Sequence, residues 1–359
     1  MRVLLAGGGT AGHIEPAMNL ADALRRRDPS MEISAVGTER GLESRLVPER
    51  GYPLHLIPAV PLPRRPSMDL ISLPFRLRNA IRACRKIIDE TKPDVIVGFG
   101  GFVALPAYLA ARRANIPVVV HEANAKAGLA NRIGARSAKA RAENVAGSLS
   151  DATRVGIPLR RSVSTLDRRA LRDEALAHFG ISGDRPVLLV FGGSQGAQRI
   201  NSAVWAALPA LLAAEVTVIH GVGQRNAEAA PAGIADRYVP LAYIDRMDLA
   251  YAVADLALCR SGAMTCAELA AVGVPAIYVP LAIGNGEQRL NATPVVAAGG
   301  GLIVEDLALN GEIVITEILP LLGDGARLAT MGSAAAIWGV RDADELLADI
   351  VVRVAAEGP

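Results

Sequence analysis

Cysteine, aromatic residues and long apolar runs are all scarce in this chain. Three cysteines among 359 residues, Cys84, Cys259 and Cys266, show no C-x-x-C spacing, which argues against a disulfide framework or a zinc site and favours a reducing cytoplasm. Aromatic residues make up only 4%, so few side chains are available to stack on nucleic-acid bases. No segment approaches the ~18 to 20 uninterrupted apolar residues of a membrane-spanning helix, and the first residues lack a signal-peptide cleavage site. We therefore expect a soluble or membrane-peripheral protein that does not bind nucleic acid.

The remaining composition predicts a folded protein with an uneven distribution of charge. Apolar residues make up 51% and charged residues 21%, and a chain of this length predicts two domains. Residues 1–160 contain 24 Lys and Arg against 14 Asp and Glu, a net charge of +10, whereas the remainder contains 14 against 22, a net charge of −8. This asymmetry predicts that the first half faces an anionic partner, and the scarcity of aromatic residues favours a membrane surface over nucleic acid.

Runs of Val, Ile and Leu alternate with helical patterns along the chain. The run "RVLLAGG" precedes "AMNLADALRRR", the run "DVIVGFG" precedes "ALPAYLAARRA", and the alternation starts again at "PVLLVFGG" after "VGIPLRR". This order predicts an α/β protein with two doubly wound parallel sheets, in domains at 1–160 and 162–340. Residues 58–75, with five prolines, are predicted to form an irregular excursion from the first sheet.

Glycine-rich turns follow predicted strands at three places. Gly7 to His13 reads G-G-G-T-A-G-H, Gly98 to Phe102 reads G-F-G-G-F, and Gly192 to Ala197 reads G-G-S-Q-G-A. Such a turn points backbone N–H groups and the positive end of a helix at a phosphate, whatever the phosphate is attached to. A dinucleotide site would also need an acidic residue at the end of the second strand, where Glu39 comes late and is followed by Arg40. One dinucleotide cofactor does not need three such turns.

Several motifs, in order along nearly the whole chain, resemble the MurG-type transferases. They include "GGGTAGHIEPAMNLADAL", "GTERGLESRLVPERGY", "HEANAKAGLANR", "CRSGAMTCAELAAVGVPAIYVPL" and "NGEQRLNA". The resemblance implies a GT-B fold, two Rossmann-like domains with a cleft between them, and a last helix at about 341–357 that packs back on the first domain. It implies an inverting transferase that moves N-acetylglucosamine (GlcNAc) from UDP-GlcNAc to the muramoyl 4-hydroxyl of lipid I, forming lipid II for peptidoglycan. The alternatives are another GT-B nucleotide-sugar enzyme, such as a UDP-GlcNAc epimerase, and, more distantly, a dinucleotide-binding oxidoreductase.

The resemblance places the acceptor in the first domain. His13, at the start of the helix after the first strand, is the candidate base, because an α-linked donor and a β-linked product require attack from the face opposite UDP. A helix N-terminus favours a neutral imidazole, which can accept a proton; capping of the helix is the alternative role. The implied acceptor-side loops contain Gly9, Gly100, Gly101, His121 and Glu122, and for the last two the alternative is that they only brace the loop.

The resemblance also implies the donor site. Glu268 would accept hydrogen bonds from the two ribose hydroxyls, Ser194 would hold the diphosphate, and Arg160 would supply charge as the phosphate leaves, with a linker salt bridge as its alternative. The backbone at Ile244 would read uracil. Ala11 replaces a glycine of the family pattern, which restricts the backbone there. The full set implied for UDP-GlcNAc is Thr10, Ala11, Gly12, Asn124, Arg160, Ser194, Ile244, Ala263, Met264, Thr265, Glu268, Gln288 and Asn291.

We expect no metal or other cofactor. The only D-x-D motif, Asp342-Ala343-Asp344, is predicted to open the last helix as a cap. Leaving-group charge would instead be met by helix N-termini and arginine.

A basic segment predicts contact with the membrane. Residues 64–86 contain seven basic residues and one acid. The helical stripe of Leu77, Ile81, Cys84 and Ile88 is expected to pack on its own sheet. The residues expected to face the cytoplasmic leaflet and its anionic lipids are Leu70, Ile71, Leu73, Phe75, Arg76, Arg78 and Arg82. The expected location is thus the cytoplasmic face of the cell membrane, with UDP-GlcNAc and lipid I as partners and other proteins of cell-wall synthesis and division left open.

Overall fold

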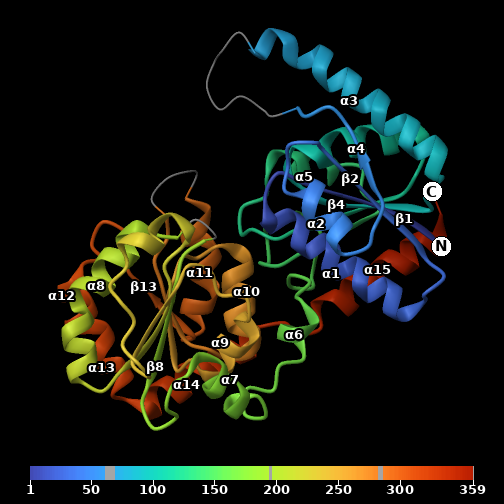
Figure 1. The fold of residues 1–359 in the computed structure, drawn as a ribbon. Helices are drawn as coiled ribbons and strands as arrows, with labels where there is room; N and C mark the ends of the chain where they lie inside the picture. Colours follow the sequence, from blue (N-terminus) through green and yellow to red (C-terminus); the bar gives the residue numbers. More distant parts are fainter. Residues whose placement is uncertain (61–68, 194–195, 282–285, 359) are drawn as a thin grey trace. The chain divides into compact units, whose positions relative to one another are not determined.

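The computed structural model describes the chain except for residues 61–68, 194–195, 282–285 and 359, and the side chains of residues 69–71. Contacts divide the chain into two compact units (Figure 1). Unit 1 comprises Met1–Arg160 and Asp342–Pro359, and unit 2 comprises Arg161–Arg341.

Unit 1 is built on a seven-stranded sheet in which every neighbouring pair is parallel. The strand order β3-β2-β1-β4-β5-β6-β7 reverses direction between β1 and β4, which is the topological switch point where ligands bind in such sheets. The strands are β1 (Arg2–Gly7), β2 (Glu32–Gly37), β3 (Leu54–Leu56), β4 (Val95–Gly100), β5 (Val118–Glu122), β6 (Ala140–Glu143) and β7 (Thr153–Arg154). Their Val, Ile and Leu runs are buried because helices cover both faces of the sheet.

The helices of unit 1 come from both ends of the chain. They are α1 (Ala11–Arg27), α2 (Glu43–Glu49), α3 (Asp69–Thr91), α4 (Gly101–Ala114), α5 (Leu129–Gly134) and α15 (Ala343–Glu357). Helix α15 packs beside α1, where Leu347 and Val351 join Leu20 and Leu24 in one core. Ion pairs extend this contact at the surface, for example Arg27 Nη1 to Asp349 Oδ1 at 2.6 Å.

Unit 2 repeats the same topology with six parallel strands. The order β10-β9-β8-β11-β12-β13 has its switch point between β8 and β11. The strands are β8 (Val187–Phe191), β9 (Thr217–Gly221), β10 (Tyr238–Leu241), β11 (Leu256–Cys259), β12 (Ala276–Tyr278) and β13 (Gly301–Ile303). Two doubly wound parallel sheets were predicted from the sequence, and this α/β fold class is confirmed.

The helical elements of unit 2 precede its first strand, alternate with its strands, and continue after its last strand. They are α6 (Arg161–Ser164), α7 (Arg172–Phe179), α8 (Gln198–Ala213), the 3₁₀ helix η1 (Gln224–Ala229), α9 (Met247–Val253), α10 (Ala263–Val272), α11 (Glu287–Ala297), α12 (Gly311–Ile313), the π-helix η2 (Val314–Ile318), α13 (Leu319–Leu322) and α14 (Gly325–Trp338).

Two local predictions need correction. The irregular excursion was predicted to continue to residue 75, but α3 begins at Asp69 and contains Pro74. A proline inside a helix removes one backbone donor, and the apolar stripe that runs from Leu73 to Ile88 at helical spacing outweighs that loss. The second correction concerns Asp342, which is the N-cap residue of α15 as predicted but makes no side-chain capping bond.

Candidate active site

The first part of the candidate site lies where β1 and β4 end side by side in unit 1. Gly7 is the register partner of Gly100, so the turns that follow the two strands start next to each other. The turn after β1 leads into α1, whose third residue is the half-buried His13. The turn from β4 into α4 consists of Gly100, the last residue of β4, and Gly101, the first residue of α4.

His13 lies against the second of these turns. Its Nδ1 is 3.0 Å from Thr10 Oγ1. A Cβ atom built on Gly100 or Gly101 would lie 3.4 Å from His13 Cδ2 or Nδ1, respectively. Gly101 has φ +76°, and a Cβ there would also collide with the carbonyl oxygen of Gly8, so only glycine allows the two turns to approach this closely. The structure thus brings together His13, Gly100 and Gly101 at the switch point.

Glu43 accepts a hydrogen bond from the glycine turn after β1. This role of Glu43 was not predicted from the sequence. Its side chain on α2 is fully buried, and its carboxylate accepts from Gly9 N at 3.1 Å, Thr38 N at 3.0 Å and Thr38 Oγ1 at 2.9 Å. A Cβ on Gly41 would collide with this carboxylate. The available signal was an acidic residue two positions after Gly41, in the turn that follows β2. A carboxylate at such a position can accept hydrogen bonds from several backbone N–H groups.

Glu122 similarly braces the loop after β5. The buried carboxylate accepts from Asn124 N at 2.9 Å, Gly128 N at 3.1 Å and Asn131 Nδ2 at 2.8 Å. Asn131, also missed, accepts in turn from Tyr108 Oη at 2.7 Å. For Glu122 the geometry favours the bracing role, and Asn124 is held in place through it.

His121 is a fully buried member of the same strand. Its Nε2 is 2.8 Å from Gly156 O, and its Nδ1 has no hydrogen-bond partner among the described residues. Burial lowers the pKa of His121 to about 4. The imidazole is therefore neutral, with Nε2–H donating to the carbonyl of Gly156, and this also favours a bracing role over direct contact with a substrate.

The remaining predicted residues of unit 1 surround the start of α1. Arg160 makes a two-point ion pair with Glu15, from Nη2 to Oε1 at 2.6 Å and from Nε to Oε2 at 3.1 Å, so the salt-bridge alternative is present in the structure. Glu15 lies two residues after His13 on α1. Thr10, Ala11 and Gly12 are exposed. Ala11 is not among the described non-glycine residues with positive φ, so the methyl group that replaces a glycine causes no backbone strain.

The second part of the candidate site lies at the equivalent switch point of unit 2. The turn after β8 begins at Gly192, and Ser194 lies outside the described residues. After the neighbouring strand β11, helix α10 begins with Gly262 as N-cap and a half-buried first turn of Ala263, Met264 and Thr265. A helix N-terminus beside a glycine turn is a suitable site for a diphosphate.

Glu268 lies on α10, beyond this first turn. It is half-buried, and its Oε2 accepts a hydrogen bond from the hydroxyl of Tyr251 at 2.8 Å. Helix α11, which carries Gln288 and the buried Asn291, packs beside α10. Gln288 Oε1 accepts from Leu281 N at 2.9 Å. Tyr251 was not predicted, because it is 17 residues from Glu268 and no local pattern marks it.

Ile244 has a buried side chain in unit 2. A Cβ on Gly221, the last residue of β9, would lie 3.1 Å from Ile244 Cδ1. With its side chain directed into the protein, Ile244 can offer a ligand only its backbone, which is the role implied by the resemblance.

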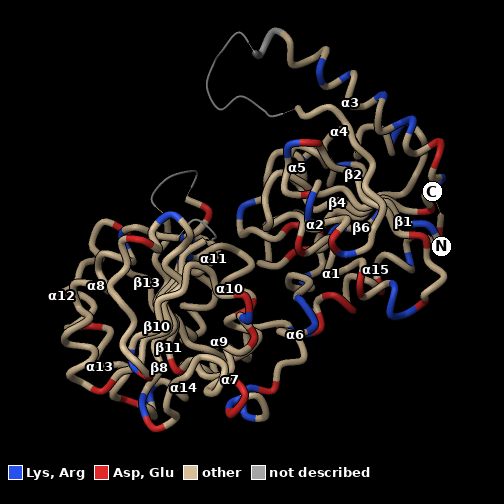
Figure 2. The backbone as a smooth tube through the Cα atoms, in the orientation of Figure 1, with Lys and Arg blue, Asp and Glu red and all other residues tan. Residues whose placement is uncertain are grey.

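The predicted membrane-facing segment divides into two parts along α3. Cys84 and Ile88 are buried in the core of unit 1, so the expected packing of this stripe on its own unit is present. Toward the start of the helix Leu73 and Arg76 are half-buried, Phe75 is 70% exposed, and Arg78 and Arg82 are exposed. Figure 2 shows basic residues along this helix. The side chains of Leu70 and Ile71 lie outside the described residues.

The described residues contain neither a membrane-spanning helix nor a cluster of metal-binding side chains. None of the helices in the described ranges combines the length and apolar character needed to span a bilayer. Within the same ranges, no group of three or more His, Cys, Asp or Glu side chains could hold a metal ion. In the D-x-D motif, Asp344 is instead ion-paired with Arg26 at 2.6 Å.

Comparison with known families covers most of both units. The family model for the glycosyltransferase family 28 N-terminal domain matches residues 3–142, and the one for the C-terminal domain matches residues 187–347. The chain belongs to glycosyltransferase family 28. A relative from Nocardia farcinica is 59% identical to this family 28 chain, over 99% of the chain and 96% of the relative. One from Streptomyces avermitilis is 58% identical, over 99% of both. Each carries the name UDP-N-acetylglucosamine–N-acetylmuramyl-(pentapeptide) pyrophosphoryl-undecaprenol N-acetylglucosamine transferase.

Solved structures agree with the family assignment. MurG of Acinetobacter baumannii has a TM-score of 0.79 and 28% identity, covering 98% of this family 28 chain and 99% of its own. The predicted MurG-type membership and GT-B fold are confirmed. A UDP-GlcNAc 2-epimerase from Neisseria meningitidis, solved with UDP-GlcNAc, has a TM-score of 0.68 but 14% identity, over 98% of this chain and 100% of its own. That second likeness shows the fold alone.

Proposed function

We propose that this chain transfers GlcNAc from UDP-GlcNAc to the muramoyl 4-hydroxyl of lipid I and so forms lipid II. The observation that carries the proposal is 58 to 59% identity, over nearly the full length, to relatives named for this transfer. The arrangement of both switch points supports the proposal. Each substrate of the reaction contains a diphosphate, and each unit has a glycine turn, after β1 in unit 1 and after β8 in unit 2.

His13 acts as general base in this proposal. When Nδ1–H donates to Thr10 Oγ1, the lone pair of Nε2 can accept the proton of the acceptor hydroxyl. The hydroxyl oxygen attacks the anomeric carbon from the face opposite UDP, so the new C–O bond forms as the bond to the β-phosphate oxygen breaks. UDP leaves with the electron pair, the configuration inverts, and His13 later releases its proton to water.

Unit 2 holds the donor in this proposal. The turn after β8 and the first turn of α10 bind the diphosphate, Glu268 binds the ribose, and the backbone at Ile244 binds uracil. Gln288 and Asn291 on α11 face the sugar. Arg160 supplies positive charge to the leaving phosphate, exchanging its contact with Glu15 for one with UDP. We propose that no metal takes part, so that transfer measured in a chelator such as EDTA should equal transfer measured in added Mg²⁺.

An assay with and without acceptor separates the proposed transfer from the alternatives. A transferase releases UDP from UDP-GlcNAc only when lipid I is present and produces a β-linked disaccharide. A 2-epimerase would convert UDP-GlcNAc without any acceptor, and an oxidoreductase would require a nicotinamide cofactor. Release of UDP that depends on lipid I is the expected result, and conversion of the donor in the absence of lipid I would contradict the proposal.

We further propose that the protein works at the cytoplasmic face of the cell membrane, where an acceptor with a polyprenyl tail resides. Support comes from the start of α3, which carries the exposed Phe75 and the basic residues Arg76, Arg78 and Arg82. Apolar residues flanked by basic ones are typical of helices that lie in a membrane interface. Other proteins of cell-wall synthesis and division are further candidate partners.

A further inference from the structure

A buried tyrosine touches the carboxylate assigned to the ribose. Tyr251, on α9, is fully buried, and its hydroxyl lies 2.8 Å from Glu268 Oε2 on α10. Burial and the adjacent Glu268 carboxylate raise the pKa of Tyr251 well above its usual range. The phenol therefore keeps its proton, and the direction of the hydrogen bond is fixed: Tyr251 donates and Glu268 accepts.

Tyr251 is itself held rigidly from two sides. Its ring makes an edge-on contact with Phe191, the last residue of β8, with ring centroids 6.5 Å apart. Its backbone carbonyl accepts from Arg168 Nε at 2.9 Å. The same guanidinium donates to the carbonyls of Ala254 and Gly273, which follow the last residues of α9 and α10. Arg168 thus ties together the carboxyl ends of the two helices whose side chains form the Tyr251–Glu268 pair.

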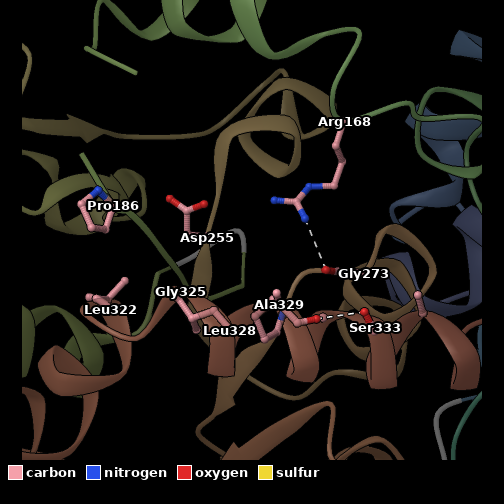
Figure 3. Close-up of a pocket in the computed structure, with 12 residues that line it drawn as sticks. Arg168, Pro186, Asp255, Gly273, Leu322, Gly325, Leu328, Ala329 and Ser333 are labelled. Carbon is pink, nitrogen blue, oxygen red and sulfur yellow. Dashed lines mark hydrogen bonds between the residues drawn. The ribbon is translucent and has the colours of Figure 1, made fainter. Parts of the chain in front are cut away.

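The Arg168 contact lies at the other edge of the sheet from the candidate nucleotide site. Figure 3 shows Arg168 reaching toward Gly273 in a pocket of about 520 Å³. The pocket is also lined by Pro186, Asp255 and Pro275, which immediately precede β8, β11 and β12, respectively. The pocket therefore lies at the amino ends of the strands, whereas nucleotides bind at the carboxyl ends. Arg168 joins the ends of α9 and α10 at this pocket.

We propose that Tyr251 is a positioning residue that fixes the Glu268 carboxylate for the two hydroxyls of the ribose. A glutamate side chain has several rotatable bonds, and holding it in one rotamer before the ligand arrives removes an entropic cost from binding. A carboxylate has about four acceptor sites, and the bond from Tyr251 uses one of them. The consequence is a preference for UDP over a nucleotide that lacks a ribose hydroxyl. The inference rests on the proposed function, because it requires Glu268 to contact ribose.

Tyr278 provides a matched control in the same unit. It is also fully buried, on β12, but its hydroxyl has no hydrogen-bond partner among the described residues. Removing the hydroxyl from either tyrosine is the same chemical change at the same burial. Only the change at Tyr251 removes a contact with Glu268.

The test is a calorimetric titration of the full chain with UDP and with 2′-deoxy-UDP. Tyr251→Phe should weaken UDP binding by up to about tenfold, because UDP would then have to immobilise the Glu268 side chain itself, and should weaken 2′-deoxy-UDP binding less. Tyr278→Phe should leave both affinities unchanged. In transfer assays, the KM for UDP-GlcNAc should rise in Tyr251→Phe while kcat at saturating donor stays close to that of the parent. Comparing two ligands on one protein sample cancels any difference in the folded fraction.

A double-mutant cycle with Glu268→Ala decides between positioning and a merely structural role. If Tyr251 acts through Glu268, then Tyr251→Phe should have no further effect on UDP affinity in the Glu268→Ala background. An equal loss in both backgrounds would overturn the inference. So would a Glu268→Ala variant that binds UDP more weakly while Tyr251→Phe binds it normally, although the ribose assignment would then stand. Unchanged UDP affinity in Glu268→Ala would remove Glu268 from the donor site and overturn both.

Discussion

The two units share a strand order but hold the turns at the carboxyl edge of the sheet in different ways. Unit 1 buries three glutamates at this edge, Glu43, Glu122 and Glu143. Each accepts hydrogen bonds from loop backbone, for example Gly9 N to Glu43 and Leu149 N to Glu143. In the described part of unit 2, no Asp or Glu is buried. There the half-buried Glu268 accepts a hydrogen bond from the hydroxyl of Tyr251.

The two units differ in the source of the anion that accepts hydrogen bonds from the turns at this edge of the sheet. A buried carboxylate is costly unless several donors surround it, and backbone N–H groups in a glycine-rich turn supply such donors. Unit 1 uses its own carboxylates in this way, so the protein itself fixes the loops around His13. Under the proposed function, the diphosphate of UDP-GlcNAc supplies the anion in unit 2, whereas the diphosphate of lipid I meets turns that Glu43 and Glu122 already brace. Four predictions test this contrast between the units.

The largest effect should come from His13→Ala, which separates the chemistry proposed for unit 1 from the donor binding proposed for unit 2. Loss of a general base typically lowers the rate by ~10² to 10⁴. We expect the rate of transfer at saturating lipid I to fall in this range while the affinity for UDP-GlcNAc, measured by calorimetry, stays the same. His55→Ala, a change of the same kind on β3 of the same unit, should leave the rate unchanged. Full turnover by His13→Ala would show that this imidazole is not the base.

The second prediction tests whether the positive charge of unit 1 serves the membrane. Replacing Arg76, Arg78 and Arg82 by Glu should weaken binding to anionic vesicles by about 3 kcal/mol or more, since each basic residue contributes about 1 kcal/mol near such a surface. Transfer to bilayer-embedded acceptor should slow, and transfer to a water-soluble short-chain analogue should not.

A charge-matched control accompanies this variant. Arg169, Arg327 and Arg353 are exposed elsewhere on the chain, and their replacement by Glu changes the net charge equally. This control should bind the same vesicles as the parent does. If the α3 variant lost activity on both acceptors alike, the segment would serve folding or catalysis, and the docking proposal would fail.

The third prediction concerns the buried histidine of unit 1. The pKa of His121 in the folded chain, about 4, lies below the value of about 6.5 for an exposed histidine. Between these pH values the unfolded chain binds a proton that the folded chain does not, so the free energy of unfolding should fall as the pH drops from about 6.5 to about 4. The loss due to His121 is at most about 3 kcal/mol.

His121→Gln keeps a donor for Gly156 and removes the titrating group, so its unfolding free energy should depend less on pH in this window. Denaturant titrations followed by far-UV circular dichroism measure this slope. Unit 2 has its own buried histidine, His220, whose pKa burial lowers to about 3. Both tryptophans, Trp205 and Trp338, lie in unit 2, so their fluorescence reports that unit and should keep the parental slope in His121→Gln. An unchanged slope by circular dichroism would contradict the prediction.

The smallest effect should come from Glu43→Gln, which tests the internal anion of unit 1 directly. An amide group would direct N–H donors at those of Gly9 and Thr38, and an unsatisfied buried group costs about 1 to 3 kcal/mol. We expect the free energy of unfolding to fall by this amount while UDP affinity stays constant. Glu49→Gln, on the same helix but exposed, should change stability by less than about 0.5 kcal/mol. Equal stability of the two variants would mean that the Glu43 contacts add nothing.

The sheets and the positions of their turns could be predicted from the amino-acid sequence. Val, Ile and Leu runs separated by helical patterns predict parallel strands because both faces of such sheets are covered, and glycine turns after strands predict anion sites because the geometry is local. The basic first half of the chain and the buried stripe that contains Cys84 and Ile88 were also predicted, because both depend on residues that are close in sequence. The start of α3 was not, because the five prolines of residues 58–75 favour a loop, whereas the helical spacing from Leu73 onward favours a helix.

Which side chains meet across the turns depends on the packing of the folded chain. Glu43 reaches Gly9 across 34 residues, His121 reaches Gly156 across 35, and Tyr251 reaches Glu268 across 17. None of these pairs shares an element, and each depends on how a helix or loop packs on its sheet. Local periodicity specifies the face that an element buries, but it does not specify the neighbour that this face meets. Whether a glutamate in a motif binds a ligand or braces a loop is therefore fixed by packing, through the donors that surround its carboxylate.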